Sequence, residues 1–318
     1  MKTLKISTAG VSHDYKHGLL PILIQSLGYH IEWVKPSESD LLIYGPFLKP
    51  KTKKFRWLPR ATRPLVTSAE DSIRRALGPR KNAPVSIFHT SESIRHDAIP
   101  ADFSLSFDLA VCDEKHFRFP YWMEMVDWSA EGITCNQNPR FGQLFNIQRL
   151  MQPLGREFLT KPQKAAIFTS HLREPRATLF RVLQQYIEVD GFGPHFDHKI
   201  KNHHLSNFSK LDILKEYAFN LCPENGLSPG YYTEKIPEAF LAGSLPITWT
   251  DTNVQVDFNP HAFINLLPLT AENFEPLQEL LHSQVLLNQY AEQALLLKAP
   301  SIEPLREFLS RVIQDATS

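Results

Sequence analysis

One stretch in the second half of the chain gathers the side chains that are best suited to chemistry. Glu224 and Asn225 directly follow an apolar run, and Thr233, Glu234 and Lys235 come after a glycine-containing loop. Thr233 has the position and the hydroxyl of a helix N-cap, which would place the next residues in the first helical turn. Because the start of a helix presents free N–H groups and the positive end of the helix dipole, this pattern suits a bound phosphate.

Glu234 and Lys235 complement a nucleotide diphosphate in type and position. The positive charge of Lys235 is unfavourable at a helix start unless an anion is bound there. The carboxylate of Glu234 can accept hydrogen bonds from ribose hydroxyls. The spacing therefore predicts a nucleotide-sugar site, and the alternative is a capped helix with an exposed acid and an exposed lysine.

Short apolar runs alternate with helical patterns along the chain, and they predict the elements that hold these residues. Helical spacing of apolar residues occurs at 19–27, 176–186, 233–242 and 274–313. The runs that predict strands are 4–7, 30–34, 41–44, 85–90, 164–169, 217–221, 245–249 and 263–267. Strands that alternate with helices predict parallel, doubly wound α/β sheets, whose ligands lie at the carboxyl ends of the strands.

A length of 318 residues allows one large domain or two medium domains. The strand–helix rhythm occurs twice, so we expect two α/β halves. The predicted division places residues 1–155 in the first half and residues 156–318, with the C-terminal helices, in the second.

The second half resembles the inverting α-1,3/α-1,4-fucosyltransferases, glycosyltransferase family ten, and in particular their bacterial members. That family carries F-N-L-x-x-E-N, five further residues, Y-x-T-E-K, an apolar helix and P-I/V-x-W. The corresponding segments here are FNLCPEN at 219–225, YYTEK at 231–235 and PITW at 246–249. The resemblance extends roughly over residues 85–275, and it is dense in the second half and thin in the first.

The resemblance implies a GT-B fold, in which two Rossmann-type domains face a cleft. The first domain would bind the acceptor and the second would bind GDP-fucose. Arg176 and Lys235 would neutralise the diphosphate of the donor, and Glu234 would hold its ribose. Asn225 and Tyr231 would line the donor pocket.

The general base of the family lies at a strand end of the type F-Y-T-G-E-N, which corresponds here to FHTSES at 88–93. By this resemblance Glu92 takes the proton from the acceptor hydroxyl. Ser91 stands where the family has glycine, and this restricts the turn that aims the carboxylate. His89 is expected to pack within the strand.

The reaction that the resemblance implies needs no covalent nucleophile from the protein. L-Fucose would move from GDP-fucose, with inversion, to a glycan hydroxyl, expected to be the 3-hydroxyl of N-acetylglucosamine or glucose. Mg²⁺ and Mn²⁺ take oxygen ligands, and this chain has no Asp-x-Asp to hold such an ion. We therefore expect no cofactor and no obligatory metal, and we expect the clustered histidines to bind none: His195, His198, His203 and His204.

The 34 basic residues are balanced by 34 acidic residues, which argues against a nucleic-acid partner. Three cysteines cannot form a disulfide framework and are typical of a reducing compartment. Neither a signal peptide nor an apolar run long enough to span a membrane is recognisable. The expected location is the cytoplasm, with peripheral attachment to the inner membrane as a further hypothesis.

Residues 49–63 contain seven basic residues and no acid. One interpretation is a solvated loop. The other is weak contact with a membrane surface or an anionic glycan, which the aromatic residues Phe55 and Trp57 favour.

The partners expected are thus GDP-fucose and a glycan or lipid-linked saccharide acceptor. Two other functions stay open at this stage. One is a GDP-sugar transferase that uses another deoxysugar, and the other is a non-catalytic protein of the same fold that binds a glycan or a nucleotide. A third hypothesis, a membrane-surface adaptor, depends on the basic segment alone.

Overall fold

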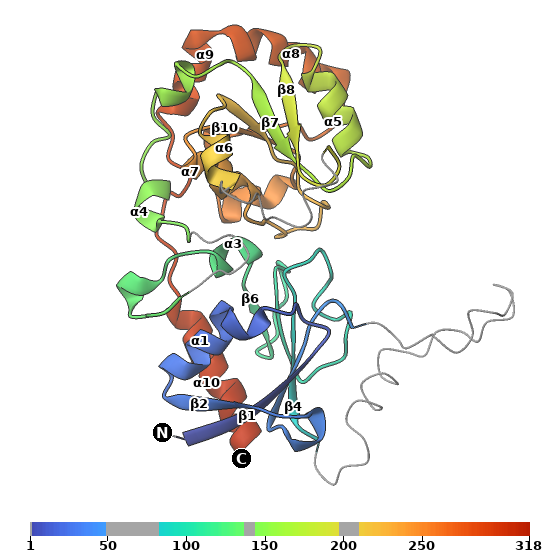
Figure 1. The fold of residues 1–318 in the computed structure, drawn as a ribbon, viewed down its shortest axis with the longest axis vertical. Helices are drawn as coiled ribbons and strands as arrows, with labels where there is room; N and C mark the ends of the chain where they lie inside the picture. Colours follow the sequence, from blue (N-terminus) through green and yellow to red (C-terminus); the bar gives the residue numbers. More distant parts are fainter. Residues whose placement is uncertain (1, 49–82, 137–143, 197–209) are drawn as a thin grey trace, which may run out of the picture. The chain divides into compact units, whose positions relative to one another are not determined.

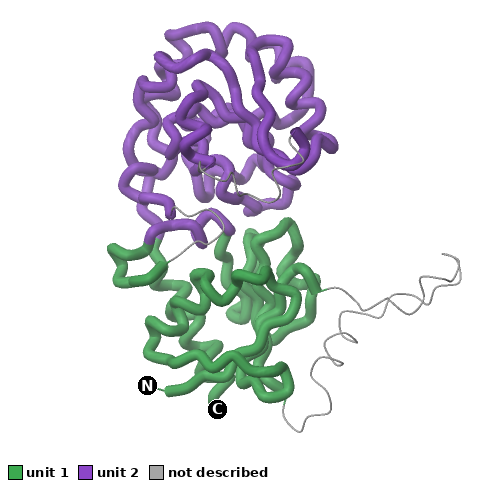
Figure 2. Tube along the Cα trace, viewed as in Figure 1, with its two compact units in different colours: residues 1–120, 128–136, 301–318 green, residues 121–127, 137–300 purple. Residues whose placement is uncertain are grey.

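The computed structural model describes residues 2–48, 83–136, 144–196 and 210–318. They form two compact units, which Figure 2 distinguishes by colour. Unit 1 comprises Met1–Pro120, Trp128–Asn136 and Ser301–Ser318, and unit 2 comprises Tyr121–Asp127 and Gln137–Pro300. The basic segment at 49–63 lies outside the described residues, as do His198, His203 and His204.

The described part of unit 1 contains a six-stranded sheet in the order β2-β1-β3-β4-β5-β6. All neighbouring strands pair in parallel. The strands are β1 (Lys2–Ala9), β2 (Tyr29–Trp33), β3 (Leu41–Tyr44), β4 (Val85–His89), β5 (Phe103–Ser106) and β6 (His116–Arg118). The first four were predicted from their apolar runs and are confirmed, whereas β5 and β6 were not predicted.

Apolar side chains of unit 1 fill both faces of this sheet, as expected for parallel strands. Every residue of β3 is buried. One face packs around Leu42, Tyr44, Phe88 and Ile99. The helix α1 (Leu19–Ser26) follows β1 and buries a leucine-rich side, so it connects two parallel strands in the usual way.

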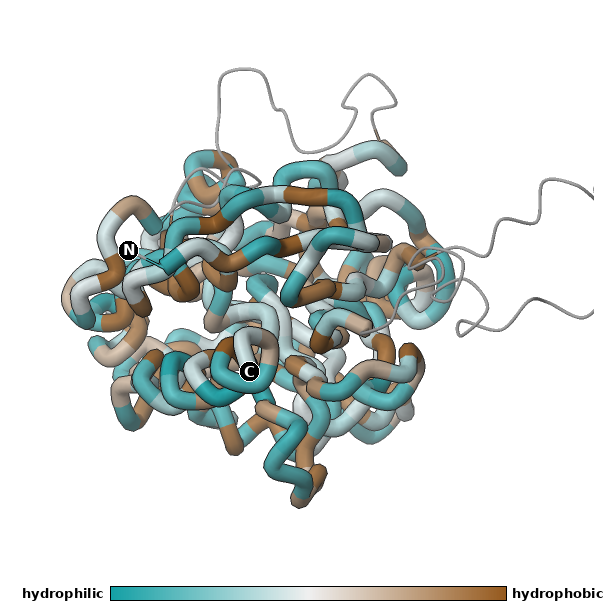
Figure 3. The backbone as a smooth tube through the Cα atoms, turned by 90° about the horizontal axis from the view of Figure 1, so that it is seen from below, coloured by the Kyte–Doolittle hydropathy of each residue, from teal (hydrophilic) through white to brown (hydrophobic). Residues whose placement is uncertain are grey.

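The last helix, α10 (Glu303–Thr317), belongs to unit 1 and not to the second half as the sequence division of 1–155 and 156–318 placed it. Its buried side chains recur every three or four residues: Leu305, Phe308, Leu309, Val312 and Ile313. This side contacts β4 and α1 (Figure 1), and the Phe308 ring lies 6.0 Å from Phe103 and 5.4 Å from Phe117. Figure 3 shows hydrophobic and hydrophilic positions alternating near the C-terminus. The amphipathic pattern predicts the helix, but it does not say which unit provides the apolar surface.

The described part of unit 2 contains a five-stranded parallel sheet in the order β11-β10-β9-β7-β8. The strands are β7 (Ala165–Phe168), β8 (Val189–Phe192), β9 (Phe219–Leu221), β10 (Leu245–Thr248) and β11 (Ile264–Asn265). All except β8 were predicted as strands. In β8, Gly191 lies against the Phe196 ring, to which an added Cβ would come within 2.4 Å.

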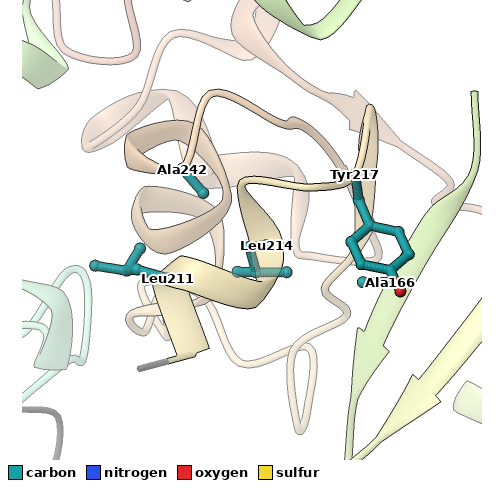
Figure 4. Close-up of a cluster of buried hydrophobic side chains, with 5 residues drawn as sticks. All are labelled: Ala166, Leu211, Leu214, Tyr217 and Ala242. Atoms are coloured by element: carbon teal, nitrogen blue, oxygen red, sulfur yellow. The ribbon is translucent and has the colours of Figure 1, made fainter. Parts of the chain in front are cut away.

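The helices in the described part of unit 2 are α3 (Tyr121–Glu124), α4 (Ile147–Leu150), α5 (Arg176–Leu183), α6 (Lys210–Leu214), α7 (Lys235–Leu241), α8 (Ala271–His282) and α9 (Gln284–Ala291). The helix α7 contacts β10, and α4 and α6 contact α7. Figure 4 shows one buried cluster, in which Leu211 and Leu214 of α6 meet Ala166 of β7, Tyr217 and Ala242. The segment at 274–313, which was predicted to be helical, contains parts of three helices: α8, α9 and α10. They are separated at Ser283 and at 292–302.

Short 3-10 helices complete the structure: η1 (Tyr15–His17), η2 (Pro36–Glu38), η5 (Ser129–Glu131), η6 (Glu157–Leu159), η7 (Thr252–Val256) and η8 (Pro260–Ala262). None of the helices in the described ranges is long and apolar enough to cross a membrane.

Candidate functional site

The carboxyl edge of the unit 2 sheet has a topological switch point between β7 and β9. The chain passes from β7 to β8 on one side, and the strands that follow continue on the other side of β7. In open parallel sheets, ligands bind outside the carboxyl ends of the strands at such a point. The segment after β7 leads to Arg176 and the segment after β9 carries Glu224 and Asn225, so both reach this edge.

A chain of hydrogen bonds joins three of the predicted site residues. The Arg176 guanidinium donates from NH2 to the Asn225 side-chain oxygen, and the Asn225 amide donates to the Tyr231 hydroxyl over 3.3 Å. Arg176 is 8% exposed and Tyr231 is buried. The fold therefore fixes the first residue of α5, a residue that follows β9 and a loop residue against each other.

Glu224 is the centre of a second network at the same edge. Its fully buried carboxylate accepts hydrogen bonds from the Thr233 backbone N–H at 2.8 Å and from the Thr233 hydroxyl. The Lys235 ammonium donates to Glu224 Oε2 at 3.1 Å and to Thr233 Oγ1 at 2.7 Å. Glu224 thus anchors the loop at 225–232 to the start of α7, which agrees with a structural role.

The start of α7 differs slightly from the prediction. The helix begins at Lys235, and Glu234 occupies the N-cap position without a capping hydrogen bond from its side chain. Thr233 was predicted as the N-cap, but its hydroxyl is bonded to Glu224 and Lys235. A buried carboxylate that competes for this hydroxyl is not visible in the local spacing. The positive character of the site therefore rests on side-chain cations.

The two cations of the site have opposite pKa shifts. Desolvation opposes the charge of Lys235, but Glu224 and Glu234 outweigh it and raise its pKa above the ordinary value. Desolvation lowers the pKa of the Arg176 guanidinium, although Glu224, Tyr231 and Glu234 act in the other direction. Glu234 Oε1 lies 3.8 Å from the Lys235 ammonium, so the predicted ribose acceptor and the predicted phosphate ligand are neighbours.

His171 is a site residue that the sequence analysis missed. It lies in the segment between β7 and α5, and Arg176 NH1 is 3.0 Å from its Nε2 and 3.3 Å from its Nδ1. Burial, together with the charges of Arg176 and Arg173, lowers the pKa of His171. The signal that could have revealed it is its place between a strand end and the predicted arginine helix.

Glu92 lies in unit 1, in the turn that follows β4, and not among the residues of unit 2. The Thr90 hydroxyl accepts a hydrogen bond from the Glu92 backbone N–H at 3.1 Å and donates to the Glu92 carbonyl at 3.2 Å. Neither Ser91 nor Glu92 has a positive φ angle, so this turn forms without the glycine of the family motif. His89 is buried in β4, as expected, and its Nδ1 lies 2.7 Å from the Tyr15 hydroxyl.

No group of three or more metal-ligating side chains that could hold an ion occurs in the parts of the chain that the structure describes. His195 of the histidine cluster packs edge-on against Phe196, with 4.9 Å between the ring centroids. Cys222 is buried, and burial raises the pKa of its thiol, so it behaves as a small core residue.

Comparison with known families identifies the segment that carries this site. Residues 158–293 match the family model described as glycosyltransferase family 10 (fucosyltransferase), C-term. The second half of the chain is therefore similar to glycosyltransferase family 10. The matched residues include all of unit 2's predicted site residues: Arg176, Asn225, Tyr231, Glu234 and Lys235. The resemblance drawn from the sequence motifs is therefore confirmed.

A curated protein similar to this chain is the α-(1,3)-fucosyltransferase FucT of Helicobacter pylori. It is 25% identical over 205 residues, which cover 57% of this chain. The chain covers 40% of that relative's length.

Two solved structures show the same fold over nearly the whole chain. A crystal structure of an α1,3-fucosyltransferase with GDP-fucose has a TM-score of 0.65 at 19% identity, and covers 99% of this chain and 91% of that one. A structure of an α1,3-fucosyltransferase with GDP has a TM-score of 0.63 at 19% identity, with coverage of 98% and 91%. The protein has the GT-B-type architecture of two Rossmann-like α/β units, as the sequence predicted.

Proposed function

We propose that this protein transfers L-fucose from GDP-fucose to a hydroxyl of a glycan acceptor, with inversion at the anomeric carbon. The observation that supports the proposal most directly is the convergence of Arg176, Asn225, Tyr231 and Lys235 at the switch point of unit 2. These residues belong to the segment that matches the family model. The name of the Helicobacter pylori relative states α-(1,3)-fucosyl transfer for that protein.

The donor diphosphate binds to the two cations of unit 2. Arg176 has five N–H donors, and its bonds to His171 and Asn225 leave further hydrogens for phosphate oxygens. Lys235 directs two of its three N–H bonds to Glu224 and Thr233, which leaves one for the ligand. Glu234 accepts hydrogen bonds from the ribose, and Asn225 and Tyr231 form the wall beside it.

Transfer is a single displacement at C1 of fucose. The acceptor oxygen forms a bond to C1 of fucose as the bond from C1 to the β-phosphate oxygen breaks. Glu92 takes the proton of the acceptor hydroxyl, and GDP leaves with the electron pair of the broken bond. Arg176 and Lys235 stabilise the charge that develops on the diphosphate. In comparable sites, each such donor lowers the activation free energy by about 3 kcal/mol.

The acceptor is a glycan or a lipid-linked saccharide, with the 3-hydroxyl of N-acetylglucosamine or glucose as the position attacked. Catalysis proceeds without an obligatory metal, because side-chain cations perform the charge neutralisation that a metal ion would otherwise provide. Activity is therefore expected to persist in EDTA. Complete loss in EDTA that Mn²⁺ restores would contradict this part of the proposal.

The test of the proposal is transfer to N-acetyllactosamine, followed by NMR of the product. We expect an α-linked fucose and release of one GDP for each fucose transferred. A β-linkage would exclude the inverting displacement, and transfer from GDP-mannose but not GDP-fucose would favour the alternative deoxysugar or hexose donor. Binding of GDP-fucose with no transfer to any saccharide would favour the non-catalytic binding protein.

Substitution of the base tests the catalytic step separately. Glu92→Gln should lower turnover by about 10²–10⁴-fold, because the variant lacks a group that can accept the proton. GDP affinity should stay within about 2-fold of wild type, since unit 2 provides the donor site. Wild-type turnover in Glu92→Gln would remove Glu92 from this role.

A further inference from the structure

The loop that carries Glu92, residues 90–102 between β4 and β5, is held at its start and in its middle by buried polar side chains. At the first end, Thr90 is 2% exposed, and its backbone N–H donates to the Leu105 carbonyl of β5 at 3.1 Å. Its hydroxyl bonds both backbone groups of Glu92. The start of the loop is therefore fixed to β5 and to its own turn.

Asp108 holds the middle of the loop. It lies two residues after β5, and its side chain is 1% exposed. Its Oδ2 accepts a hydrogen bond from the His96 backbone N–H at 2.6 Å and lies 3.2 Å from His96 Nδ1. Its Oδ1 forms an ion pair with the Arg95 guanidinium. Two consecutive loop residues are thus bound to one carboxylate.

The Asp108 carboxylate is itself fixed by β5. The Ser106 hydroxyl donates to Asp108 Oδ2 at 3.0 Å and accepts from the Asp108 backbone N–H at 3.1 Å. Ser106 is completely buried. Because a hydrogen bond in a buried site has little competition from water, this arrangement gives Asp108 one orientation.

The Glu92 side chain is different from its neighbours. Within the described ranges, no hydrogen bond or ion pair engages its carboxylate, although both backbone groups of the residue are bonded. The loop backbone is therefore fixed while the carboxylate stays available for a ligand. This arrangement is expected for a catalytic carboxylate whose position must be fixed while its charge stays unpaired.

We propose that Asp108 is a positioning residue for Glu92. This inference rests on the proposed function, in which Glu92 accepts the proton of the acceptor. Asp108 and Thr90 together hold the Glu92 loop against the carboxyl end of β5. Misplacement of a reacting group by about 1 Å can lower a rate by about 10²-fold, so this support is expected to control turnover.

The test compares Asp108→Asn in wild-type and Glu92→Gln backgrounds, with GDP-fucose and N-acetyllactosamine as substrates. Asn retains one acceptor oxygen but loses the charge that binds Arg95. We expect kcat to fall by about 10- to 100-fold in the wild-type background, with KM for GDP-fucose unchanged. In the Glu92→Gln background the same change should have no further effect, because the group that Asp108 positions is already lost.

Asp102→Asn is the matched control. Asp102 also binds a serine hydroxyl and a backbone N–H, those of Ser86 at 2.7 and 2.8 Å, but it lies at the amino edge of the same sheet. Its substitution should leave kcat unchanged. An equal loss in both Asp102→Asn and Asp108→Asn would indicate a general effect on the fold of unit 1, and would overturn the positioning role.

Hydrogen exchange gives a readout that does not depend on activity. In Asp108→Asn, the amides of residues 92–97 should exchange faster, while those of β4 should not change. If Asp108→Asn does not fold, Thr90→Val and Thr90→Ser provide a second pair, in which only Thr90→Ser should retain kcat and slow exchange. A fully active Asp108→Asn beside an inactive Glu92→Gln would overturn the positioning role alone, whereas a fully active Glu92→Gln would overturn the proposed base and this inference together.

Discussion

Arg176 and Lys235 are both withdrawn from water, but they are compensated differently. Lys235 forms an ion pair with the buried Glu224 at 3.1 Å. Arg176 is bonded to the neutral side chains of His171 and Asn225, and no carboxylate among the described residues forms an ion pair with it. Because a buried charge without a counter-charge is unfavourable, Arg176 would be stabilised by a bound anion.

The substitution Arg176→Lys tests whether Arg176 binds the phosphate of GDP. The substitution keeps the charge but loses the planar group that bonds Asn225 and a phosphate together. We expect GDP affinity to fall by about 10- to 100-fold, as for the loss of a hydrogen bond to a charged group. Arg181→Lys is the control, since Arg181 lies on the same helix but is 69% exposed. Equal GDP affinity in Arg176→Lys and wild type, measured by calorimetry, would place the phosphate elsewhere.

His171 predicts a pH dependence of stability. Its pKa is lowered in the folded protein by burial, by Arg176 and by Arg173, with a weaker effect of His195. As pH falls below the ordinary histidine value of 6.5, the unfolded chain takes up this proton before the folded chain does. The contribution of His171 to the free energy of unfolding should therefore decrease from about pH 6.5 downward, until the lowered folded pKa is reached.

Denaturant unfolding of wild type and His171→Asn at pH 7.5, 6.5 and 5.5 measures this effect. The stability of wild type relative to His171→Asn should decrease across the series. A difference that stays constant with pH would show that His171 does not titrate between folded and unfolded states.

At the scale of elements, Glu224 fixes the geometry of the loop and helix that form the proposed donor site. It connects the end of β9 to Thr233 and to the first residue of α7. Lys161 supports the other end of the same helix by donating to the carbonyls of Ala242 and Gly243. The helix is short, so these polar contacts at both ends contribute to its position.

Glu224→Gln should destabilise unit 2 by about 3–5 kcal/mol, because it leaves the Lys235 ammonium buried without its main counter-charge. Asp212→Asn is the control, as Asp212 pairs with Lys215 on the surface and should change stability by less than about 1 kcal/mol. The double variant Glu224→Gln/Lys235→Met should recover part of the loss. Unchanged denaturant stability in Glu224→Gln would contradict the anchoring role.

The strands that carry the proposed donor site could be predicted because their sequences are short, continuous apolar runs. β9 and β10 are completely buried, and this burial requires such a composition. β6 has no comparable signal, since His116 and Arg118 stand on either side of Phe117 and each is only partly buried. The motif predicted where Glu92 lies, but its support by Asp108 depends on strand β5, which was itself not predicted.

At the scale of the whole molecule, the chain returns to its first unit after completing the second. The helix α10 covers part of the unit 1 sheet, and Glu131 of unit 1 bonds Ser301 and the Ile302 backbone at the start of this return. Local sequence patterns predict that a segment is helical and which of its sides is apolar. They do not reveal that the last helix packs on the first unit. Unit 1 is consequently assembled from both ends of the sequence.

Phe308→Ala tests this arrangement. The side chain is buried between Phe103 and Phe117, so its removal should lower the free energy of unfolding of unit 1 by about 3–5 kcal/mol. GDP affinity should stay at the wild-type value, because the donor site belongs to unit 2. Glu307→Ala, an exposed position on the same helix, is the control. Loss of GDP binding in folded Phe308→Ala would contradict the assignment of α10 to unit 1.

The most direct test of the proposed donor site is a calorimetric titration of the wild-type protein with GDP, GDP-fucose, GDP-mannose and UDP-galactose. We expect GDP and GDP-fucose to bind at one site per chain and Arg176→Lys to weaken both, and we expect UDP-galactose to give no heat of binding. If no guanine nucleotide binds to the folded protein, the carboxyl edge of the unit 2 sheet is not a GDP-sugar site, and the proposed transfer of fucose is contradicted.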